Sequence, residues 1–490
     1  MLKKYISIAV LLSVMVLQSC AIKGIMLDED RVENETYDVS KISRSFFIAG
    51  NTYENDTIFT SVFNKTVLEN PSKEKRLLFI GNTIQGTDSL SVKTTLDARV
   101  KQIKLLDAPT HIIPGPYEWR YNPLEGLEFM EDYLEKKLQT DTDFLTPNNG
   151  CPLESIEIGD DIQLIVIDSQ WYLENWDTHP KMNDKCQIKT REKFMAEVKG
   201  EVKKSANKLI LVAMTHPIFT NGFHAGRFSF RDHIFPLQGN IPLPGIASLI
   251  AQIRSQGATS KQDRFNKRYN ELATGLRDIF NEPDHRILLV SGLEENLQYI
   301  EQDPFKQIVS GGGSETKPVG ISDNGIFSYG GNGFTSVDVL EDGSVWTSFY
   351  KISANNTAEI LFKHKIFDAV QKPVLDSIPD TFPKYVEASV YEEEAVEKTD
   401  FFKSFWGQHY RHVYGTKVKA RTAVLDTLYG GLEIVRPGGG NQTRSLRVVT
   451  KDGKEYNLRA LKKSAVQFLE NTAFKGVNGK NILPIPYRKI

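Results

Sequence analysis

This chain of 490 residues has little cysteine and histidine, with three and nine residues respectively, and the histidines are scattered. So few cysteines exclude a disulfide-dense scaffold. Beyond the first 20 residues, no apolar run is long enough to cross a bilayer as a helix. The net charge of −2 gives no reason to expect nucleic acid or an anionic membrane surface as a partner of the whole chain. A hydrophobic content of 40% and a charged content of 25% are those of an ordinary globular protein with two or three domains.

The first 20 residues have a different composition. Lys3 and Lys4 precede an apolar run over 6–17, which predicts a signal peptide over 1–19. The run ends in Leu17-Gln18-Ser19-Cys20, which resembles a bacterial lipobox and implies cleavage before Cys20 and lipidation of its thiol. The alternative is a plain secretory peptide with an incidental cysteine. Acidic residues come late after Cys20, which favours an outer-membrane anchor with the protein facing the periplasm.

The cysteine count agrees with lipidation. If Cys20 is lipidated, Cys151 and Cys186 remain as a pair in an oxidising compartment, and a disulfide between them is expected. It would close a loop of about 35 residues and stabilise the fold by roughly 3–4 kcal/mol. The alternative is two free buried thiols.

Short apolar strands alternate with helical stretches from residue 46 onward, which predicts α/β layers. The predicted strands are 46–49, 77–80, 110–113, 162–167, 209–213, 287–290, 307–310, 333–338 and 345–349. The predicted helices are 124–138, 190–204, 269–280 and 461–474. The predicted organisation is a tether over 20–40, a main domain over 41–365, a linker over 366–424 and a small α+β region over 425–490, with a hairpin at Lys451-Asp452-Gly453.

Five loops that follow predicted strands carry a recurrent set of small and polar residues. These loops are Gly50-Asn51-Thr52-Tyr53, Gly81-Asn82-Thr83, Gly115-Pro116-Tyr117-Glu118, Thr215-His216-Pro217 and Gly292-Leu293-Glu294-Glu295. Their order and spacing resemble those of the calcineurin-like metallophosphoesterase family, and in particular its lipid-anchored bacterial members. The resemblance implies an α/β sandwich of two sheets, with a two-metal site on loops at the carboxyl ends of the strands.

The resemblance also implies which ligands are missing. In the first two loops, Asn51 stands in place of the first Asp, Tyr53 at the next ligand position, Asn82 in place of the bridging Asp and Thr83 in place of Asn. In the third loop, Pro116 and Tyr117 stand in place of Asn-His. In the last two loops, Thr215 stands in place of a ligand His before His216, and Leu293 and Glu295 stand in place of two His. Glu118 alone persists in its motif. Losing every anionic and imidazole ligand of a site with about +4 of metal charge predicts a site without metal, cofactor or catalytic residues.

Three functions are consistent with these losses. The preferred one is an inactive phosphoesterase fold that serves as a binding or scaffold subunit of an envelope complex, with an outer-membrane β-barrel or its assembly machinery as partner, because some lipid-anchored relatives continue into such a barrel. The second is a phosphoesterase with a site rebuilt from Glu118, Glu294, Glu295 and His216, which could take Mg²⁺ or Ca²⁺. The third is a metal-free binder of a phosphorylated or glycan ligand in a cleft lined by Tyr53, Tyr117 and Trp119.

Overall fold

The computed structural model describes residues 24–370, except 33–34, 54–56, 141, 149, 176–185, 226–229, 237–240, 258–259 and 323, together with six short strands beyond residue 370. The chain divides into two units at Val370. Cys20, and with it the predicted lipidation site, lies outside the described residues. None of the helices in the described part of the chain is long and apolar enough to span a membrane.

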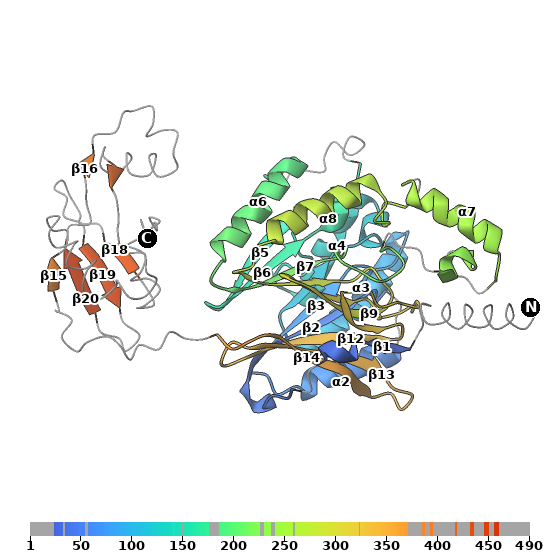
Figure 1. Cartoon of the computed structure of the whole chain (residues 1–490), viewed down its shortest axis with the longest axis horizontal. Helices are drawn as coiled ribbons and strands as arrows, with labels where there is room; N and C mark the ends of the chain where they lie inside the picture. Colours follow the sequence, from blue (N-terminus) through green and yellow to red (C-terminus); the bar gives the residue numbers. More distant parts are fainter. Residues whose placement is uncertain are drawn as a thin grey trace, which may run out of the picture. The chain divides into compact units, whose positions relative to one another are not determined.

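The first unit contains two β-sheets that face each other (Figure 1). The eight-stranded sheet has the order β1 (Ile25–Leu27), β11 (Gly325–Tyr329), β9 (Leu297–Gln302), β10 (Phe305–Ser310), β8 (Arg286–Ser291), β7 (Leu209–Met214), β6 (Ile162–Ile167) and β5 (Leu153–Ile158). The six-stranded sheet has the order β14 (Ala358–Phe367), β13 (Val345–Ile352), β12 (Gly333–Leu340), β2 (Ile42–Gly50), β3 (Glu74–Ile80) and β4 (Thr110–Ile113).

Helices cover the outer faces of both sheets (Figure 1). The helices are α2 (Thr57–Glu69), α3 (Ser89–Leu106), α4 (Pro123–Leu138), α5 (Ser169–Leu173), α6 (Arg191–Lys204), α7 (Pro244–Ser255) and α8 (Lys267–Phe280), with short 3₁₀ turns η1 (Glu29–Arg31), η2 (Val39–Lys41), η3 (Glu118–Arg120) and η5 (Phe230–His233). The fold is therefore the predicted α/β sandwich of two sheets.

Strand alternation divides the core into two parts. Along β2, Phe46 and Ile48 point into the apolar layer between the sheets, whereas Phe47 points to the helices and meets Phe63 of α2. Successive side chains of a strand alternate between the faces of its sheet, so a strand that is buried on both faces is apolar throughout. That pattern explains why β4 and β6 have the bounds predicted from the sequence.

Two segments differ from their predicted organisation. Within the predicted tether, β1 pairs antiparallel with β11, and Tyr37 donates to Asp338 at 2.6 Å. The three residues of β1 are apolar, but the run is short and polar and acidic residues follow it, so the composition of the whole segment indicated a tether. β14 continues to Phe367, two residues into the predicted linker.

The second unit is described through its strands. β15 (Tyr385–Glu387), β20 (Glu455–Arg459), β19 (Ser445–Val449) and β18 (Leu432–Val435) form one sheet in that order, and β16 (Glu393–Glu394) pairs with β17 (Lys417–Val418). The antiparallel β19–β20 pair is the hairpin predicted around Asp452-Gly453. The helix predicted over 461–474 lies outside the described residues.

The predicted disulfide is present between Cys151 and Cys186, whose Cα atoms are 5.3 Å apart. It links the segment before β5 to the segment before α6, and the two cysteines are 35 residues apart in sequence.

Candidate functional site

The five predicted loops meet at one end of the sandwich. β2, β3 and β4 run parallel in one sheet, and β6, β7 and β8 run parallel in the other, so the loops at their carboxyl ends lie together. Hydrogen bonds join the loops across the two sheets. The side-chain nitrogen of Asn51 donates to the carbonyl oxygen of Leu293 at 3.1 Å, and the Thr215 hydroxyl donates to that of Pro114 at 2.7 Å.

Asn51 and Asn82 form a series of amide hydrogen bonds at the positions where the family resemblance implies two aspartates. The backbone N–H of Tyr117 donates to the Asn82 side-chain oxygen at 3.1 Å, and the Asn82 side-chain nitrogen donates to the Asn51 oxygen at 2.8 Å. The Asn51 nitrogen then donates to the carbonyl oxygens of Leu293 and Gly311 at 3.1 and 2.9 Å. This series of hydrogen bonds begins at an N–H and ends at two carbonyls, so the side chains of Asn51 and Asn82 each have to donate and accept. A carboxylate only accepts, and therefore only amides fit both positions.

Left-handed backbone conformations accompany this series of hydrogen bonds. Asn51, Asn82 and Leu293 have φ values of 54°, 50° and 62°. Asparagine tolerates this region well, whereas leucine is strained there by about 1–2 kcal/mol. The bond from Asn51 to the Leu293 carbonyl helps to hold the strained residue in place.

The surviving carboxylate of the third motif, Glu118, is fully buried and binds backbone N–H groups. Its two oxygens accept hydrogen bonds from Asn82 at 3.1 Å, Thr83 at 2.6 Å, Ile84 at 2.7 Å and Gly115 at 2.8 Å. Burial raises the pKa of Glu118 above its ordinary value, and these donors act against that rise. The carboxylate thus ties the loop after β3 to the loop after β4.

Thr215 fills the space between these same loops. Its side chain is so close to Gly81 that a Cβ atom on Gly81 would lie 2.4 Å from the Thr215 methyl carbon. A Cβ atom on Gly115 would lie 3.0 Å from the same methyl group. The position expected for a histidine ligand is therefore occupied by a small side chain that packs against two glycines.

His216 belongs to a separate buried network. Its Nδ1 atom is 2.7 Å from the Ser169 hydroxyl, which also accepts a bond from the His216 backbone N–H at 3.1 Å. Its Nε2 atom contacts the side-chain oxygen of Gln262. This arrangement needs a neutral ring with its proton on Nε2, and burial lowers the pKa of His216 to about 4. Neighbouring Asp168 caps α5 by accepting from the Trp171 N–H at 3.0 Å, and burial raises its pKa to about 7.

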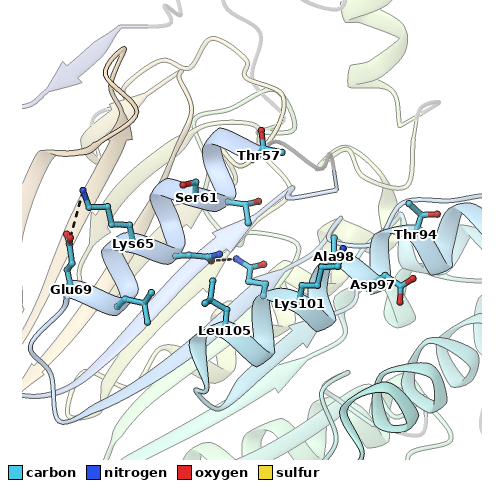
Figure 2. Close-up of a pocket in the computed structure, with 13 residues that line it drawn as sticks. Thr57, Ser61, Lys65, Glu69, Thr94, Asp97, Ala98, Lys101 and Leu105 are labelled. Atoms are coloured by element: carbon cyan, nitrogen blue, oxygen red, sulfur yellow. Dashed lines mark hydrogen bonds and ion pairs between the residues drawn. The ribbon is translucent and has the colours of Figure 1, made fainter.

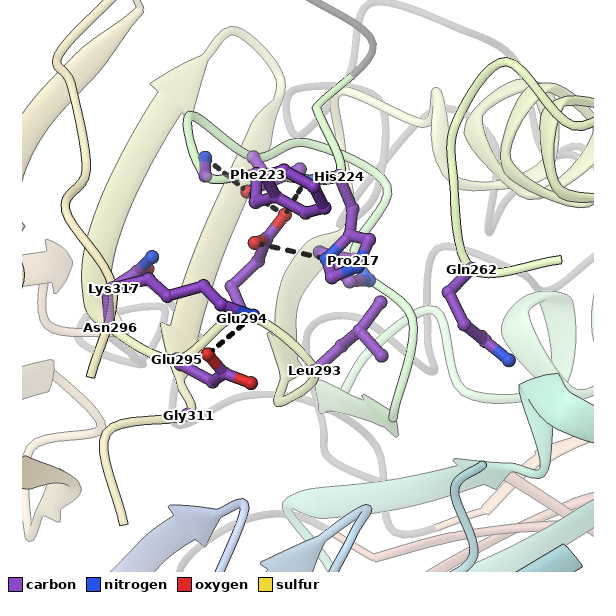
Figure 3. A network of polar contacts seen from close by, with 12 residues as sticks. Pro217, Phe223, His224, Gln262, Leu293, Glu294, Glu295, Asn296, Gly311 and Lys317 are labelled. Atoms are coloured by element: carbon purple, nitrogen blue, oxygen red, sulfur yellow. Dashed lines mark hydrogen bonds and ion pairs between the residues drawn. The ribbon is translucent and has the colours of Figure 1, made fainter. Parts of the chain in front are cut away.

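Glu294 and Glu295 point to different partners (Figure 3). Glu294 is buried and accepts bonds from the Thr220 hydroxyl at 3.1 Å, the His224 N–H at 3.0 Å and the His224 ring at 3.3 Å. Its burial opposes ionisation, but His224 and Thr220 together hold the pKa of Glu294 below its ordinary value. Glu295 forms an ion pair with Lys317 at 2.7 Å.

The four residues of the rebuilt metal site are therefore bound elsewhere. In the described part of the chain, the group with three potential ligand atoms within 4.8 Å of one another is Glu131, Glu135 and Asp143, on and after α4. Sequence reasoning missed His224 and Gln262 as members of these networks. Each comes from a loop far along the chain from its partner, and no local spacing marks it.

The aromatic residues predicted to line a ligand cleft are mostly buried. Tyr53 is 5% exposed and packs against Tyr117, with ring centroids 4.8 Å apart. Trp119 is 3% exposed and donates to Asp168 at 2.9 Å. Tyr117 is half-buried, and with Arg120, whose guanidinium lies 4.1 Å from the Tyr117 ring centroid, it lines a hollow of about 600 Å³.

A larger groove of about 880 Å³ lies between α2 and α3 (Figure 2). On its lining, Gln102 donates to Asn64 at 2.7 Å and accepts from Arg99 at 2.5 Å, and Arg99 also donates to the carbonyl of Thr52. Burial lowers the pKa of Arg99 to about 10. None of the predicted site residues lines this groove, so it is separate from the five loops.

No family model and no curated protein matches this chain. Among solved structures, it is similar to GAP50, the anchor in the inner membrane complex of Plasmodium, with 16% identity over 66% of this chain and 89% of that chain and a TM-score of 0.44. It is also similar to Vps29 of Chaetomium thermophilum, with 8% identity over 66% and 96% of the chains and a TM-score of 0.26. A third is the phosphopantetheinyl hydrolase PptH of Mycobacterium tuberculosis, with 11% identity over 55% and 90% of the chains and a TM-score of 0.26.

Vps29 and PptH have calcineurin-like metallophosphoesterase folds. At these identities and TM-scores, the likeness concerns the general α/β fold and says nothing about activity. The account of the site therefore depends on the contacts made by the chain's own residues.

Proposed function

We propose that this chain is a lipoprotein of the outer membrane in which a phosphoesterase-like fold has lost its metal chemistry and acts as a binding or scaffold subunit of an envelope complex. The observation that carries the proposal is the amide chain through Asn82 and Asn51. The two positions where the family resemblance implies metal-binding carboxylates hold amides that bond to each other and to two backbone carbonyls.

Glu118 supports the same conclusion. Moving its carboxylate onto a metal would break four hydrogen bonds from backbone N–H groups. A bond to a charged group contributes about 1.5–3 kcal/mol, and a buried donor left without a partner costs a similar amount. A metal ion would have to offset that loss without the ligands replaced by Asn51, Asn82 and Thr215.

The membrane part of the proposal depends on the sequence. Leu17-Gln18-Ser19-Cys20 has the pattern of a lipobox, and the disulfide between Cys151 and Cys186 agrees with an oxidising compartment. An inactive domain held at the membrane by a lipid acts through what it binds. The partner that we propose is an outer-membrane β-barrel or its assembly machinery, and a lipid anchor on the chain would hold the two proteins in the same membrane.

The test is purification of the tagged full chain from its native envelope in a gentle detergent, followed by identification of co-purifying proteins. The matched control is Cys20→Ser, which removes the acceptor thiol without touching any described residue. We expect an envelope protein to copurify with the native chain, and we expect acyl labelling to be lost in the control. Recovery of the native chain alone would contradict the proposal. So would phosphodiester hydrolysis by the pure chain, if a chelator abolished that activity.

A further inference from the structure

A long excursion between β7 and α8 carries helix α7 away from the sheets (Figure 1). The base of this excursion is closed, because the backbone N–H of Arg264 donates to the carbonyl of His224 at 3.2 Å. Arg254, near the end of α7, forms a buried ion pair with Asp263 at 2.7 Å and donates to the carbonyl of Phe223 at 2.9 Å. We call the described residues between 225 and 263 the α7 arm.

The five-loop site holds the α7 arm at its base. On one side of the base, His224 is bonded to the buried Glu294 (Figure 3). On the other side, Gln262 contacts His216 and donates to Gln170 at 3.0 Å. Polar residues at the former catalytic position thus fix where the arm leaves the fold.

The arm presents an apolar ridge to solvent. Ile246, Leu249 and Ile253 of α7 are 53%, 56% and 43% exposed, and Ile241 and Leu243 before the helix are 69% and 42% exposed. Positions three, four and seven residues apart share one face of a helix, so the three residues of α7 form a stripe that continues into the preceding loop. The opposite side of the helix buries small residues, Ala247 and Ala251.

The polar chemistry around this ridge suits a lipid surface. The sequence has no Asp or Glu from His233 to Gln262, although the whole chain contains 62. Asp232 directly precedes this stretch in η5, and Asp263 directly follows it and is paired with Arg254. A stretch without acidic residues can approach anionic headgroups without repulsion from its own side chains.

Two polar groups near the ridge are bonded within the arm. Pro242 and Pro244 have no N–H, and the N–H of Leu243 between them donates to the carbonyl of Ile234 at 2.7 Å. The Ser248 hydroxyl has a local acceptor in the carbonyl of His233 at 3.4 Å. These groups are therefore not available to a protein partner, and an apolar ridge with such surroundings suits the interface of a lipid bilayer.

We propose that the α7 arm inserts its apolar ridge into the interfacial region of a phospholipid bilayer, as a second membrane contact that does not depend on lipidation of Cys20. Interfacial helices bury one apolar face at the boundary between headgroups and acyl chains. Together with an anchor at the start of the chain, this contact would fix the orientation of the two-sheet domain on the membrane.

The test uses the chain from Ala21, which retains every described residue and carries no acyl group, mixed with vesicles of phosphatidylethanolamine and phosphatidylglycerol. Flotation in a density gradient measures binding. We expect the chain to float with the vesicles, and we expect the variant Ile246→Ser/Leu249→Ser/Ile253→Ser to lose binding by about tenfold or more.

The matched control is Leu68→Ser/Leu90→Ser/Leu105→Ser, which changes three leucines of α2 and α3 that are 51%, 75% and 56% exposed. This control is expected to float like the parent chain. Far-ultraviolet circular dichroism and thermal unfolding check that both variants fold. Equal loss in both variants, or no flotation of the parent chain, would overturn the proposal. So would concentration-dependent self-association that only the α7 variant abolishes, which would assign the ridge to a second copy of the chain.

Discussion

Restoring the carboxylate that the family resemblance implies at position 51 should destabilise this protein. In Asn51→Asp, the nitrogen that donates to the carbonyls of Leu293 and Gly311 becomes an oxygen, so two bonds are lost and two carbonyl oxygens face a carboxylate. The residue is 1% exposed, so water cannot replace the lost donors. Losing two bonds, leaving two acceptors unpaired and burying a charge should together lower the free energy of unfolding by about 3–5 kcal/mol.

The loss should depend on pH. The folded state disfavours the ionised aspartate, so its pKa is raised above the value in the unfolded chain. The cost is therefore small at low pH, where a protonated carboxyl can still donate one bond, and it grows as the pH rises above the unfolded value of about 3.9. Urea unfolding of the variant and the parent at several pH values measures this difference.

The control is Asn70→Asp, which makes the same chemical change elsewhere. The side-chain oxygen of Asn70 accepts a bond from the Ser72 N–H at 2.9 Å, which a carboxylate accepts equally well, and the nearby Ser45 hydroxyl donates to Asp338 at 2.5 Å. We expect little loss there. If Asn51→Asp were as stable as the parent, or if Mn²⁺ raised the stability of Asn51→Asp/Asn82→Asp, the amide chain would not be the structural element described above.

Three further predictions concern stability. Glu118→Gln replaces one oxygen that accepts two N–H bonds by a donor, so it should lower the free energy of unfolding, measured in urea, by about 3–5 kcal/mol. The control Glu157→Gln on the surface should change little, and equal values in the two variants would contradict the role of Glu118. Because the pKa of His216 is lowered in the folded protein, the unfolded chain takes up a proton first as the pH falls, and about 3 kcal/mol of stability is lost between pH 6.5 and 4. His216→Asn should flatten this part of the stability–pH curve, and an unchanged slope would refute the prediction. Cys151→Ser/Cys186→Ser should lower the free energy of unfolding by about 3–4 kcal/mol, and a double variant as stable as the parent under oxidising conditions would show that the bridge is dispensable.

The sequence predicted the central strands of both sheets but missed β1, β5, β9, β11 and β14, and it predicted some helices poorly. β4 and β6 are short apolar runs between polar residues, and helix α6 begins directly after Thr190, whose hydroxyl accepts from the Lys193 N–H at 3.1 Å. Helix α3 was not predicted because its polar residues obscure the apolar periodicity. Its capping box at Asp88 and Ser91 was a signal that could have found it.

The site shows where sequence reasoning stops. Asparagine at positions 51 and 82, where the resemblance implies aspartate, led to the hypothesis of a lost metal site. It could not show that the two amides bond to each other, because they follow different strands. Nor could it show that Glu118 turns to backbone N–H groups instead of a metal, because the loop after β3 supplies three of these donors. Such contacts depend on how the sheets bring the loops together.

Helix α7, like α2 and α5, was also not predicted from the sequence. Its run of Ile246, Leu249 and Ile253 has helical spacing, but a prediction based on burial expects such a stripe to face the core. In the structure the stripe faces solvent, and the other side of the helix buries Ala247, Ala251 and Arg254. Arg254 pairs with Asp263 of the same arm and donates to the carbonyl of Phe223, and such contacts between distant residues cannot be read from the helical spacing.

The central claim is that side chains of this protein have taken the place of a two-metal centre. The most direct test is the divalent-metal content of the purified chain from Ala21, measured by elemental mass spectrometry after dialysis against trace metals. The account predicts a content near zero for each chain, because Asn51, Asn82, Glu118 and Thr215 are bonded to one another and to the backbone. One or two tightly held ions per chain would contradict it and would favour a phosphoesterase with a rebuilt site.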